Sequence, residues 1–261
     1  MSTPPAPPPY PEPRGLLRGK RVVITAAAGG GIGFAVARRC VEEGATVVIS
    51  DIHERRLGEA ADALEALGGA RPLALRCDVT RQAEVDALFA AAEQAGGVDV
   101  VMNNAGLGGT SSLVDMGDDE WQRVMDVSLT GTMRCVRAAL RLMMPRGAGA
   151  IVNNASVLGW RAQAGQAHYA AAKAGVMALT RCAAIEAAGA GVRVNAVAPS
   201  LAMHPFLEKV TSRELLAELT AREAFGRAAE PWEVANVMVF LASDLSSYLT
   251  GEVLSVSSQH A

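Results

Sequence analysis

The sequence predicts one α/β domain built on a doubly wound parallel sheet, with helices on both faces. Three observations predict this fold. Short runs rich in valine and isoleucine alternate with stretches of helical periodicity along nearly the whole chain. These runs lack the period of two that marks half-exposed strands, so we expect strands buried on both faces. A glycine-rich turn follows the first run and opens the first helical stretch, an order typical of nucleotide-binding sheets.

Seven strands are expected, and each is a short apolar run. They lie at 21–25, 46–50, 72–79, 99–106, 150–156, 192–200 and 252–257. Helical patterns lie between them, at 31–43, 54–67, 81–95, 118–144, 164–188 and 231–243. The segment from about 200 to 228 interrupts the alternation and has a helical pattern of its own. Because an insertion there lies at the carboxyl edge of the sheet, we expect a lid over a ligand.

Bulk composition bounds the class of protein. The chain is 50% hydrophobic with a net charge of −3, which suits one large domain and makes nucleic acid an unsuitable main partner. No apolar run has the length of a membrane span, and the first residues lack the order of a secretory signal. The proline-rich residues 1–17 predict a disordered tail before a catalytic domain over 18–261.

The four cysteines show neither metal-ligand nor disulfide spacing. They are Cys40, Cys77, Cys135 and Cys182. We therefore expect four reduced thiols in the core of a cytoplasmic protein, and no metal site.

The glycines after the first strand form the pattern G-x-G-x-G with Gly29, Gly31 and Gly33. The helix is expected to begin near Ile32, so that a diphosphate would rest on its N-terminus. Asp51 follows the second strand, at the spacing of a carboxylate that binds the adenosine ribose hydroxyls. Such a carboxylate repels a 2′-phosphate, which favours NAD over NADP.

Other residues near the strand ends have two interpretations each. Arg55 and Arg56 lie near Asp51 and either pair with a 2′-phosphate or are solvated on the next helix. Asp78, in the segment CDVT, either caps the following helix or contacts the adenine. The asparagines of NNAG at 103–106 either satisfy backbone groups or approach the cofactor.

Tyr169 and Lys173 are four residues apart in a helical stretch, in the segment YAAAK, and therefore lie on one helix face. Ser156 ends the fifth strand, at the edge of the sheet where that helix begins. A phenol beside an ammonium and the positive ring of an oxidised nicotinamide can reach a pKa near neutral and act as general acid or base. Ser156 would then hold the substrate oxygen, while Lys173 lowers the pKa of Tyr169 and holds the nicotinamide ribose.

These motifs resemble those of the short-chain dehydrogenase/reductase family over residues 18–260. The resemblance rests on AAAGGGIG, Asp51, the DV at 78–79, NNAG, Ser156, YAAAK and the closing segment FLASDLSSYLTGEVLSV. It implies a Rossmann-like, NAD(P)-dependent oxidoreductase that interconverts a secondary alcohol and a ketone. It also implies a homotetramer or dimer in which the helices near 118–144 and 164–188 build one interface.

The resemblance also implies a set of site residues. The catalytic set is Ser156, Tyr169, Lys173 and Ser128, and the cofactor set is Gly29, Gly31, Ile32, Gly33, Asp51, Asp78, Val79, Asn104, Ala105, Gly106, Tyr169, Lys173 and Ser200.

The chain departs from the family pattern at three places. The first glycine of the phosphate loop falls on Ala27, unless the loop after Thr25 is one residue longer. Ser128 replaces an asparagine that holds a relay water in the family. Ser200 replaces a glycine, and His204 is either a site residue or a solvated loop histidine.

Several segments are similar to actinobacterial enzymes of steroid-ring degradation, which act on a bicyclic indane fragment held as a coenzyme A thioester. These segments include NNASVLGWRAQ and HYAAAKAGVMALTRC. The aliphatic lid suits such a substrate, and Trp160, Met203 and Phe206 are the expected contacts. A general 3-oxoacyl thioester reductase is the alternative. A dinucleotide-binding protein without catalysis is a third, supported by Ser128 alone.

Overall fold

The computed structural model describes residues 5–68, 70–204, 207 and 212–258. Seven parallel strands form one sheet in the order β3-β2-β1-β4-β5-β6-β7, which confirms the predicted doubly wound sheet. The strands are β1 (Arg21–Thr25), β2 (Thr46–Asp51), β3 (Leu73–Arg76), β4 (Val100–Asn103), β5 (Gly149–Asn154), β6 (Val192–Pro199) and β7 (Val253–Val256). The predicted strands at 72–79 and 99–106 are shorter, because their last residues turn away as loops at the carboxyl edge.

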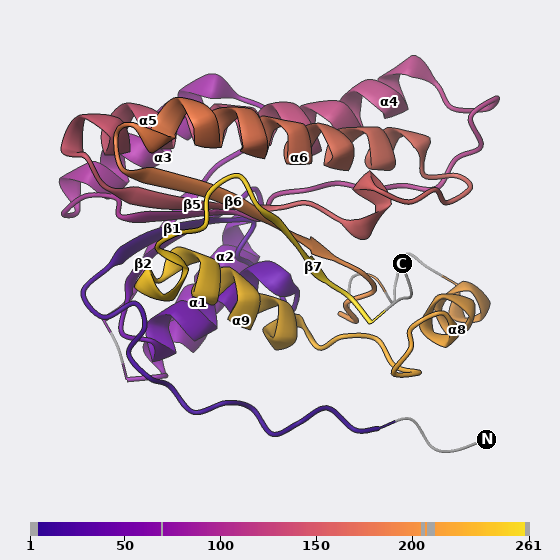
Figure 1. Cartoon of the computed structure of the whole chain (residues 1–261), viewed down its shortest axis with the longest axis horizontal. Helices are drawn as coiled ribbons and strands as arrows, with labels where there is room; N and C mark the ends of the chain where they lie inside the picture. The colour runs from indigo at the N-terminus through magenta and orange to yellow at the C-terminus, as the bar shows by residue number, and fades with distance from the viewer. Residues whose placement is uncertain (1–4, 69, 205–206, 208–211, 259–261) are drawn as a thin grey trace.

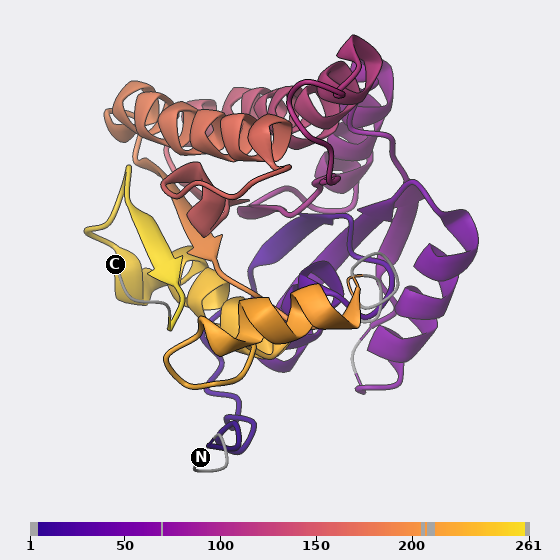
Figure 2. The same ribbon diagram turned by 90° about the vertical axis from the view of Figure 1, so that its right-hand side faces the viewer.

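Helices cover both faces of the sheet (Figure 1). One face carries α1 (Ile32–Glu42), α2 (Glu54–Glu65) and α9 (Pro231–Ala242). The other carries α3 (Gln82–Gln94), α4 (Asp118–Met125), α5 (Gly131–Arg146) and α6 (Ala167–Ala188). Helix α8 (Arg213–Ala221) belongs to the predicted lid and lies beyond the carboxyl ends of the strands, as Figure 2 shows.

Alternate side chains of the central strands point into two hydrophobic cores. Val22 and Ile24 of β1 join the core under α1 and α9, whereas Val23 joins the core under α3, α5 and α6. This alternation follows from the period of two in a strand. Because both faces are packed, the carboxyl ends of the strands are fixed platforms for the loops that follow.

The expected single helix over 118–144 is interrupted. A π-helical turn, η1 (Asp126–Thr130), separates α4 from α5. Ser128 in this turn is fully buried, and its hydroxyl accepts from Leu107 N and donates to Leu107 O, each at 2.9 Å. The wider turn thus carries a side chain that binds the loop after β4, and helical periodicity alone does not reveal it.

The disorder predicted for residues 1–17 does not describe residues 10–17, which pack on α1. Leu17 is fully buried. The buried carboxylate of Glu43 accepts from Arg14 N and Leu16 N, each at 2.9 Å. Arg39 Nη1 donates to Pro11 O at 2.7 Å. Prolines keep this segment extended, so its carbonyls remain open to the buried guanidinium.

Tyr10 fixes the outer part of the same segment. Its ring lies edge-on to Trp232 of α9, with centroids 5.4 Å apart. Its hydroxyl donates to Glu42, and the guanidinium of Arg38 lies over its ring. The segment 10–17, which we name the N-terminal strap, therefore joins α1 to α9.

The predictions about the cysteines and about membrane spans can be compared with the structure. Cys40, Cys77 and Cys135 are buried, but Cys182 is exposed, because it lies on the outer face of α6. No helix among the described residues is long and apolar enough to cross a membrane.

Candidate active site

The glycine loop between β1 and α1 has the geometry of an anion cradle. Helix α1 begins at Ile32 as expected, and its N-cap, Gly31, makes no side-chain hydrogen bond. The first amides of α1 are therefore left to bind an anion. A Cβ at Gly33 would lie 2.1 Å from Ala26 O and 2.5 Å from Asn104 Nδ2, so only glycine fits there.

The structure decides where the missing first glycine belongs. Ala26 has a φ of 50°, the left-handed conformation that favours glycine. Ala27 is fully buried, and its amide donates to Ser50 O at 3.0 Å. The loop after Thr25 is thus one residue longer than the family pattern, and the strained position is Ala26. For a residue with a side chain, this conformation costs about 1–2 kcal/mol.

Asp51 lies at the carboxyl end of β2, beside this loop. Its Oδ2 accepts from Ala28 N at 3.2 Å, and its Oδ1 accepts from His53 N at 3.0 Å. Burial raises the pKa of the carboxyl, while the Ala28 amide and Arg56 oppose the rise. The carboxylate is therefore tied to the glycine loop, as the expected ribose site requires.

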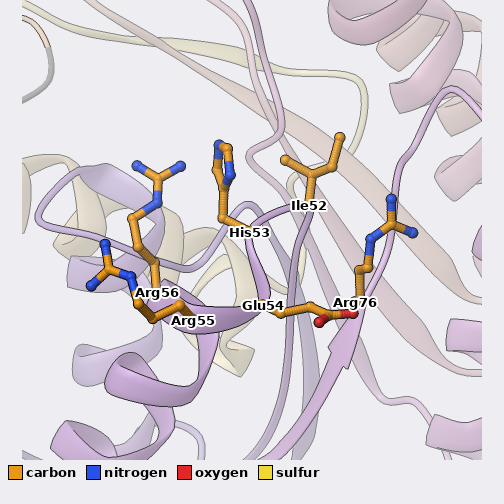
Figure 3. A pocket seen from close by; sticks show the side chains of 6 residues that line it. All are labelled: Ile52, His53, Glu54, Arg55, Arg56 and Arg76. Carbon is orange, nitrogen blue, oxygen red and sulfur yellow. The ribbon is translucent and has the colours of Figure 1, made fainter.

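A cavity of about 430 Å³ lies next to Asp51, past the ends of β2 and β3 (Figure 3). Three arginines and a histidine dominate its lining, which consists of Ile52, His53, Glu54, Arg55, Arg56 and Arg76. Arg55 pairs with Glu59 and Arg76 pairs with Glu84. Two of the three guanidinium groups are thus already engaged by carboxylates, which favours the structural interpretation of Arg55.

Asp78 and Val79 follow β3. Asp78 Oδ1 accepts from Thr80 N at 2.9 Å and from Thr80 Oγ1 at 2.7 Å, so this oxygen closes the turn before α3. Val79 is buried and packs on Gly131. A Cβ at Gly131 would lie 2.6 Å from Val79 Cγ2. Asp78 does not cap α3, whose N-cap is Arg81 and has no side-chain hydrogen bond. Contact with the adenine stays a prediction.

Asparagines at the ends of β4 and β5 form two amide pairs. Asn103 Nδ2 donates to Asn153 Oδ1, and Asn154 Nδ2 donates to Asn104 Oδ1, each at 2.9 Å. Asn104 Nδ2 in turn donates to Ala26 O at 3.0 Å. Sequence reasoning missed Asn154. The repeated NN could have indicated it, but only the β4–β5 register aligns the pairs.

Ser156, Tyr169 and Lys173 lie together at the carboxyl edge. Ser156 follows β5, and Tyr169 and Lys173 lie one turn apart on α6. Ser156 lies near enough to the Tyr169 phenol to oppose the rise of its pKa on burial. Lys173 Nζ donates to Asn154 O at 2.6 Å and lies 5.5 Å from the centre of the Tyr169 ring.

The pKa shifts of the two helix residues have opposite directions. Burial raises the pKa of Tyr169, and the Ser156 hydrogen bond opposes the rise. Burial lowers the pKa of Lys173 to about 8. In the protein alone, the Lys173 ammonium donates to the Asn154 carbonyl. The expected lowering of the Tyr169 pKa by Lys173 and an oxidised nicotinamide stays a prediction.

Ser128, the substitute for the family asparagine, forms hydrogen bonds with Leu107. Its hydroxyl accepts one bond from Leu107 N and donates one to Leu107 O, as described above. Its role in a proton relay remains a prediction, whereas its role as an anchor of the loop after β4 is visible.

The loop that Ser128 anchors lies along the start of α6. A Cβ at Gly106 would lie 3.2 Å from Lys173 Nζ, and one at Gly108 would lie 3.4 Å from the Tyr169 ring. The backbone of this loop can therefore approach both reactive side chains closely.

Met203 and Trp160, two of the three expected substrate contacts, lie in the described part of the chain. Met203 N donates to Ala229 O at 3.0 Å, and Leu216 of α8 is nearly buried. Trp160 ends the turn η2 (Val157–Gly159) after Ser156 and is half exposed. Phe206 lies outside the described residues. Ser200 N donates to Val256 O at 3.1 Å.

His204 lies beside the glycine loop. Its ring would be 3.8 Å from a Cβ at Gly31. The histidine thus lies next to the glycine loop and is partly exposed.

Among the described residues, no group of three histidine, cysteine or carboxylate side chains is arranged to hold a metal.

Comparisons with known proteins match most of the chain. A family model described as "Enoyl-(Acyl carrier protein) reductase" matches residues 26–258. A Mycobacterium tuberculosis protein, "(5R,7aS)-5-hydroxy-7a-methyl-1-oxo-2,3,5,6,7,7a-hexahydro-1H-indene-carboxyl-CoA reductase", is 66% identical over 249 residues, which cover 94% of this chain and 95% of the relative. A cis-4-hydroxycyclohexanecarboxylate dehydrogenase of Sinomonas cyclohexanicum is 43% identical, over 91% of this chain and 95% of its own.

A solved structure is similar over the same length. The crystal structure of a short chain dehydrogenase from Mycobacterium smegmatis superposes with a TM-score of 0.86 at 58% identity. The match covers 97% of this chain and 98% of that one.

Proposed function

Because the chain belongs to the short-chain dehydrogenase/reductase family, and is therefore an oxidoreductase that uses a nicotinamide dinucleotide, we propose that Tyr169, Ser156 and Lys173 carry its reaction. The reaction is the interconversion of a secondary alcohol and a ketone. The observation that carries the proposal is the convergence of the three side chains: Ser156 lies beside the Tyr169 phenol, and Lys173 lies one turn further along α6.

Each side chain has one role. In oxidation, the Tyr169 phenolate oxygen accepts the alcohol proton as the C–O bond gains double-bond character. In reduction, the Tyr169 hydroxyl donates a proton to the carbonyl oxygen. Ser156 Oγ donates a hydrogen bond to the same substrate oxygen, and Lys173 holds the ribose. The dinucleotide, when bound, supplies the hydride acceptor or donor.

The residues present fit a dinucleotide. The α1 N-terminus lacks a side-chain cap, Gly33 is packed against the loop backbone, and Asp51 lies at the adenosine end. We propose NAD rather than NADP, because the Asp51 carboxylate would repel a 2′-phosphate. Titration of the wild type with NADH and NADPH tests this. Tighter NADH binding, with a preference that Asp51→Ala erodes, is expected. Tighter NADPH binding would make Arg55 or Arg56 the phosphate partner.

For the substrate, we propose a ring alcohol or ketone on a bicyclic indane fragment held as a coenzyme A thioester. The support is the name and 66% identity of the mycobacterial relative. The described apolar side chains of the lid, with half-exposed Trp160, suit such a rigid ring system.

A comparison of kcat/KM tests the substrate. We expect a larger value for the hydroxy-indane thioester than for a straight-chain acetoacetyl thioester. The reverse order would favour a 3-oxoacyl thioester reductase, the function printed for a Thermotoga maritima relative at 38% identity. Absence of hydride transfer with both substrates, although the dinucleotide binds, would favour a non-catalytic binding protein.

We also propose a cytoplasmic homo-oligomer with a catalytic domain over 18–261. The support is the pattern of buried thiols together with the family resemblance.

A further inference from the structure

His168 is a buried titratable side chain that the proposed reaction does not use. It directly precedes Tyr169 on the first turn of α6 and is fully buried. A buried imidazole needs partners for its ring nitrogens, because an unsatisfied polar group is costly in the interior. The environment of each nitrogen therefore shows what this histidine does.

The Nδ1 atom accepts a hydrogen bond from Tyr169 N at 2.9 Å. A ring nitrogen that accepts carries no proton, so the neutral ring has its proton on Nε2. A protonated imidazolium would turn a second N–H toward the Tyr169 amide and break this bond. The hydrogen bond thus favours the Nε2–H tautomer of His168.

The bond also satisfies a donor that the helix leaves open. The first amides of an α-helix have no intrahelical acceptor, and Tyr169 N is the third amide of α6. The N-cap residue, Gln166, makes no cap with its side chain, which donates instead to Gly109 O and Thr110 Oγ1. Consequently His168 performs the capping that Gln166 does not.

The Nε2 atom faces Glu120 of α4. It lies 3.5 Å from Glu120 Oε1, and it has no aligned hydrogen-bond partner. Gly109 closes the space between them: a Cβ there would lie 3.2 Å from Nε2 and 3.3 Å from the Glu120 oxygen. Helix α4, the loop after β4 and the first turn of α6 therefore meet at this one ring.

We propose that His168 is a positioning residue for Tyr169, held as the neutral Nε2–H tautomer between the Tyr169 amide and Glu120. The inference rests on the proposed function of Tyr169. Lys173 is held independently, through Asn154 O. Loss of the His168 cap should therefore move the phenol and lower kcat, while dinucleotide binding stays nearly unchanged.

The test compares two variants of matched size. His168→Leu fills the space without an acceptor, whereas His168→Asn places an amide oxygen near the position of Nδ1. With the hydroxy-indane thioester and NAD, we expect His168→Leu to lower kcat roughly tenfold or more, with KM for NAD changed less than about twofold. His168→Asn should keep kcat within about threefold. Wild-type kcat in folded His168→Leu would overturn the proposal.

A double-mutant cycle separates positioning from general stability. If His168 acts through the Tyr169 hydroxyl, His168→Leu should cause no further loss in the Tyr169→Phe background. An equal loss in both backgrounds would contradict positioning. Unchanged turnover of Tyr169→Phe itself would instead overturn the proposed function, so the two failures are distinguishable.

Glu120 provides the same test without a core substitution, because its side chain is about a third exposed. We expect Glu120→Leu to lower kcat several-fold and Glu120→Gln to keep kcat near the wild-type value, since the glutamine side chain still places an amide oxygen beside Nε2. Equal kcat for wild type and Glu120→Leu would contradict the role of the α4 contact.

Discussion

Tyr169 and Lys173 begin from opposite pKa shifts, and burial causes both. A buried phenol keeps its proton to higher pH, while a buried ammonium loses its proton at lower pH. In the protein alone, Lys173 thus titrates first, at about 8, and its charge does not produce a tyrosinate near neutral pH. We therefore expect much of the positive charge that favours the phenolate to come with the oxidised cofactor.

The Lys173 shift predicts a pH dependence of stability. Between a folded pKa of about 8 and the ordinary value of 10.5, the unfolded chain holds the proton and the folded chain does not. Stability from this group therefore rises with pH across that window and is constant below it. Urea unfolding at several pH values should show wild type gaining stability relative to Lys173→Met above about pH 8. A pH-independent difference would show that the ammonium is not desolvated.

Some of the buried polar contacts could be predicted from the sequence, and others depend on the tertiary structure. The Tyr169–Lys173 spacing and the strand end at Ser156 predict a shared site, because both follow from local periodicity. The roles of Asn154 and His168 depend on the β4–β5 register and on the α4–α6 contact, which no local pattern encodes. Ser128 was singled out as a relay candidate, but its contact with Leu107 required the folded loop.

At the scale of elements, the strands and helices follow the apolar periodicity, because both faces of the sheet are packed. The π-helical turn and the N-terminal strap do not follow it. Each is held by tertiary hydrogen bonds: Ser128 to the Leu107 backbone, and Arg39 and Glu43 to the strap backbone. A proline-rich segment is predicted to be disordered when nothing is known to bind it. Here the segment binds the Arg39–Glu43 ion pair at the C-terminal end of α1.

Removal of the strap should destabilise the domain. Deletion through Gly15 takes away acceptors of Arg39 and a donor to Glu43, whose side chains are 6% and 0% exposed. Loss of one hydrogen bond to a charged group costs about 1.5–3 kcal/mol, so we expect at least about 2 kcal/mol in urea unfolding. Deletion through Pro9, which keeps Tyr10, is the control and should change stability by less than about 0.5 kcal/mol. Equal stability of both deletions would mean that the strap contacts contribute nothing.

At the scale of the whole molecule, large apolar side chains remain on the surface. Ile185 on α6 is 82% exposed, and Leu245 and Tyr248 before β7 are 66% and 100% exposed. Exposed apolar groups gathered on particular elements are typical of protein–protein contacts. Ile185 lies on α6, one of the long helices that the family resemblance expects at a subunit interface.

The oligomeric state can be tested at this face. Light scattering should give about four times the chain mass of 27.1 kDa for the wild type and a smaller assembly for Ile185→Asp. Leu113→Asp, at a similarly exposed apolar side chain in the loop before α4, should leave the mass unchanged. A monomeric wild type, or an Ile185→Asp variant of unchanged mass, would contradict the interface.

The most direct test of the account is single-turnover hydride transfer in Tyr169→Phe, measured by nicotinamide absorbance with the hydroxy-indane thioester. Phenylalanine keeps the ring and removes only the hydroxyl that moves the proton. We expect the rate to fall roughly a hundredfold to ten-thousandfold, while the Kd for NADH changes little. A Tyr169→Phe variant that transfers hydride at the wild-type rate would contradict the assignment of Tyr169 as acid and base.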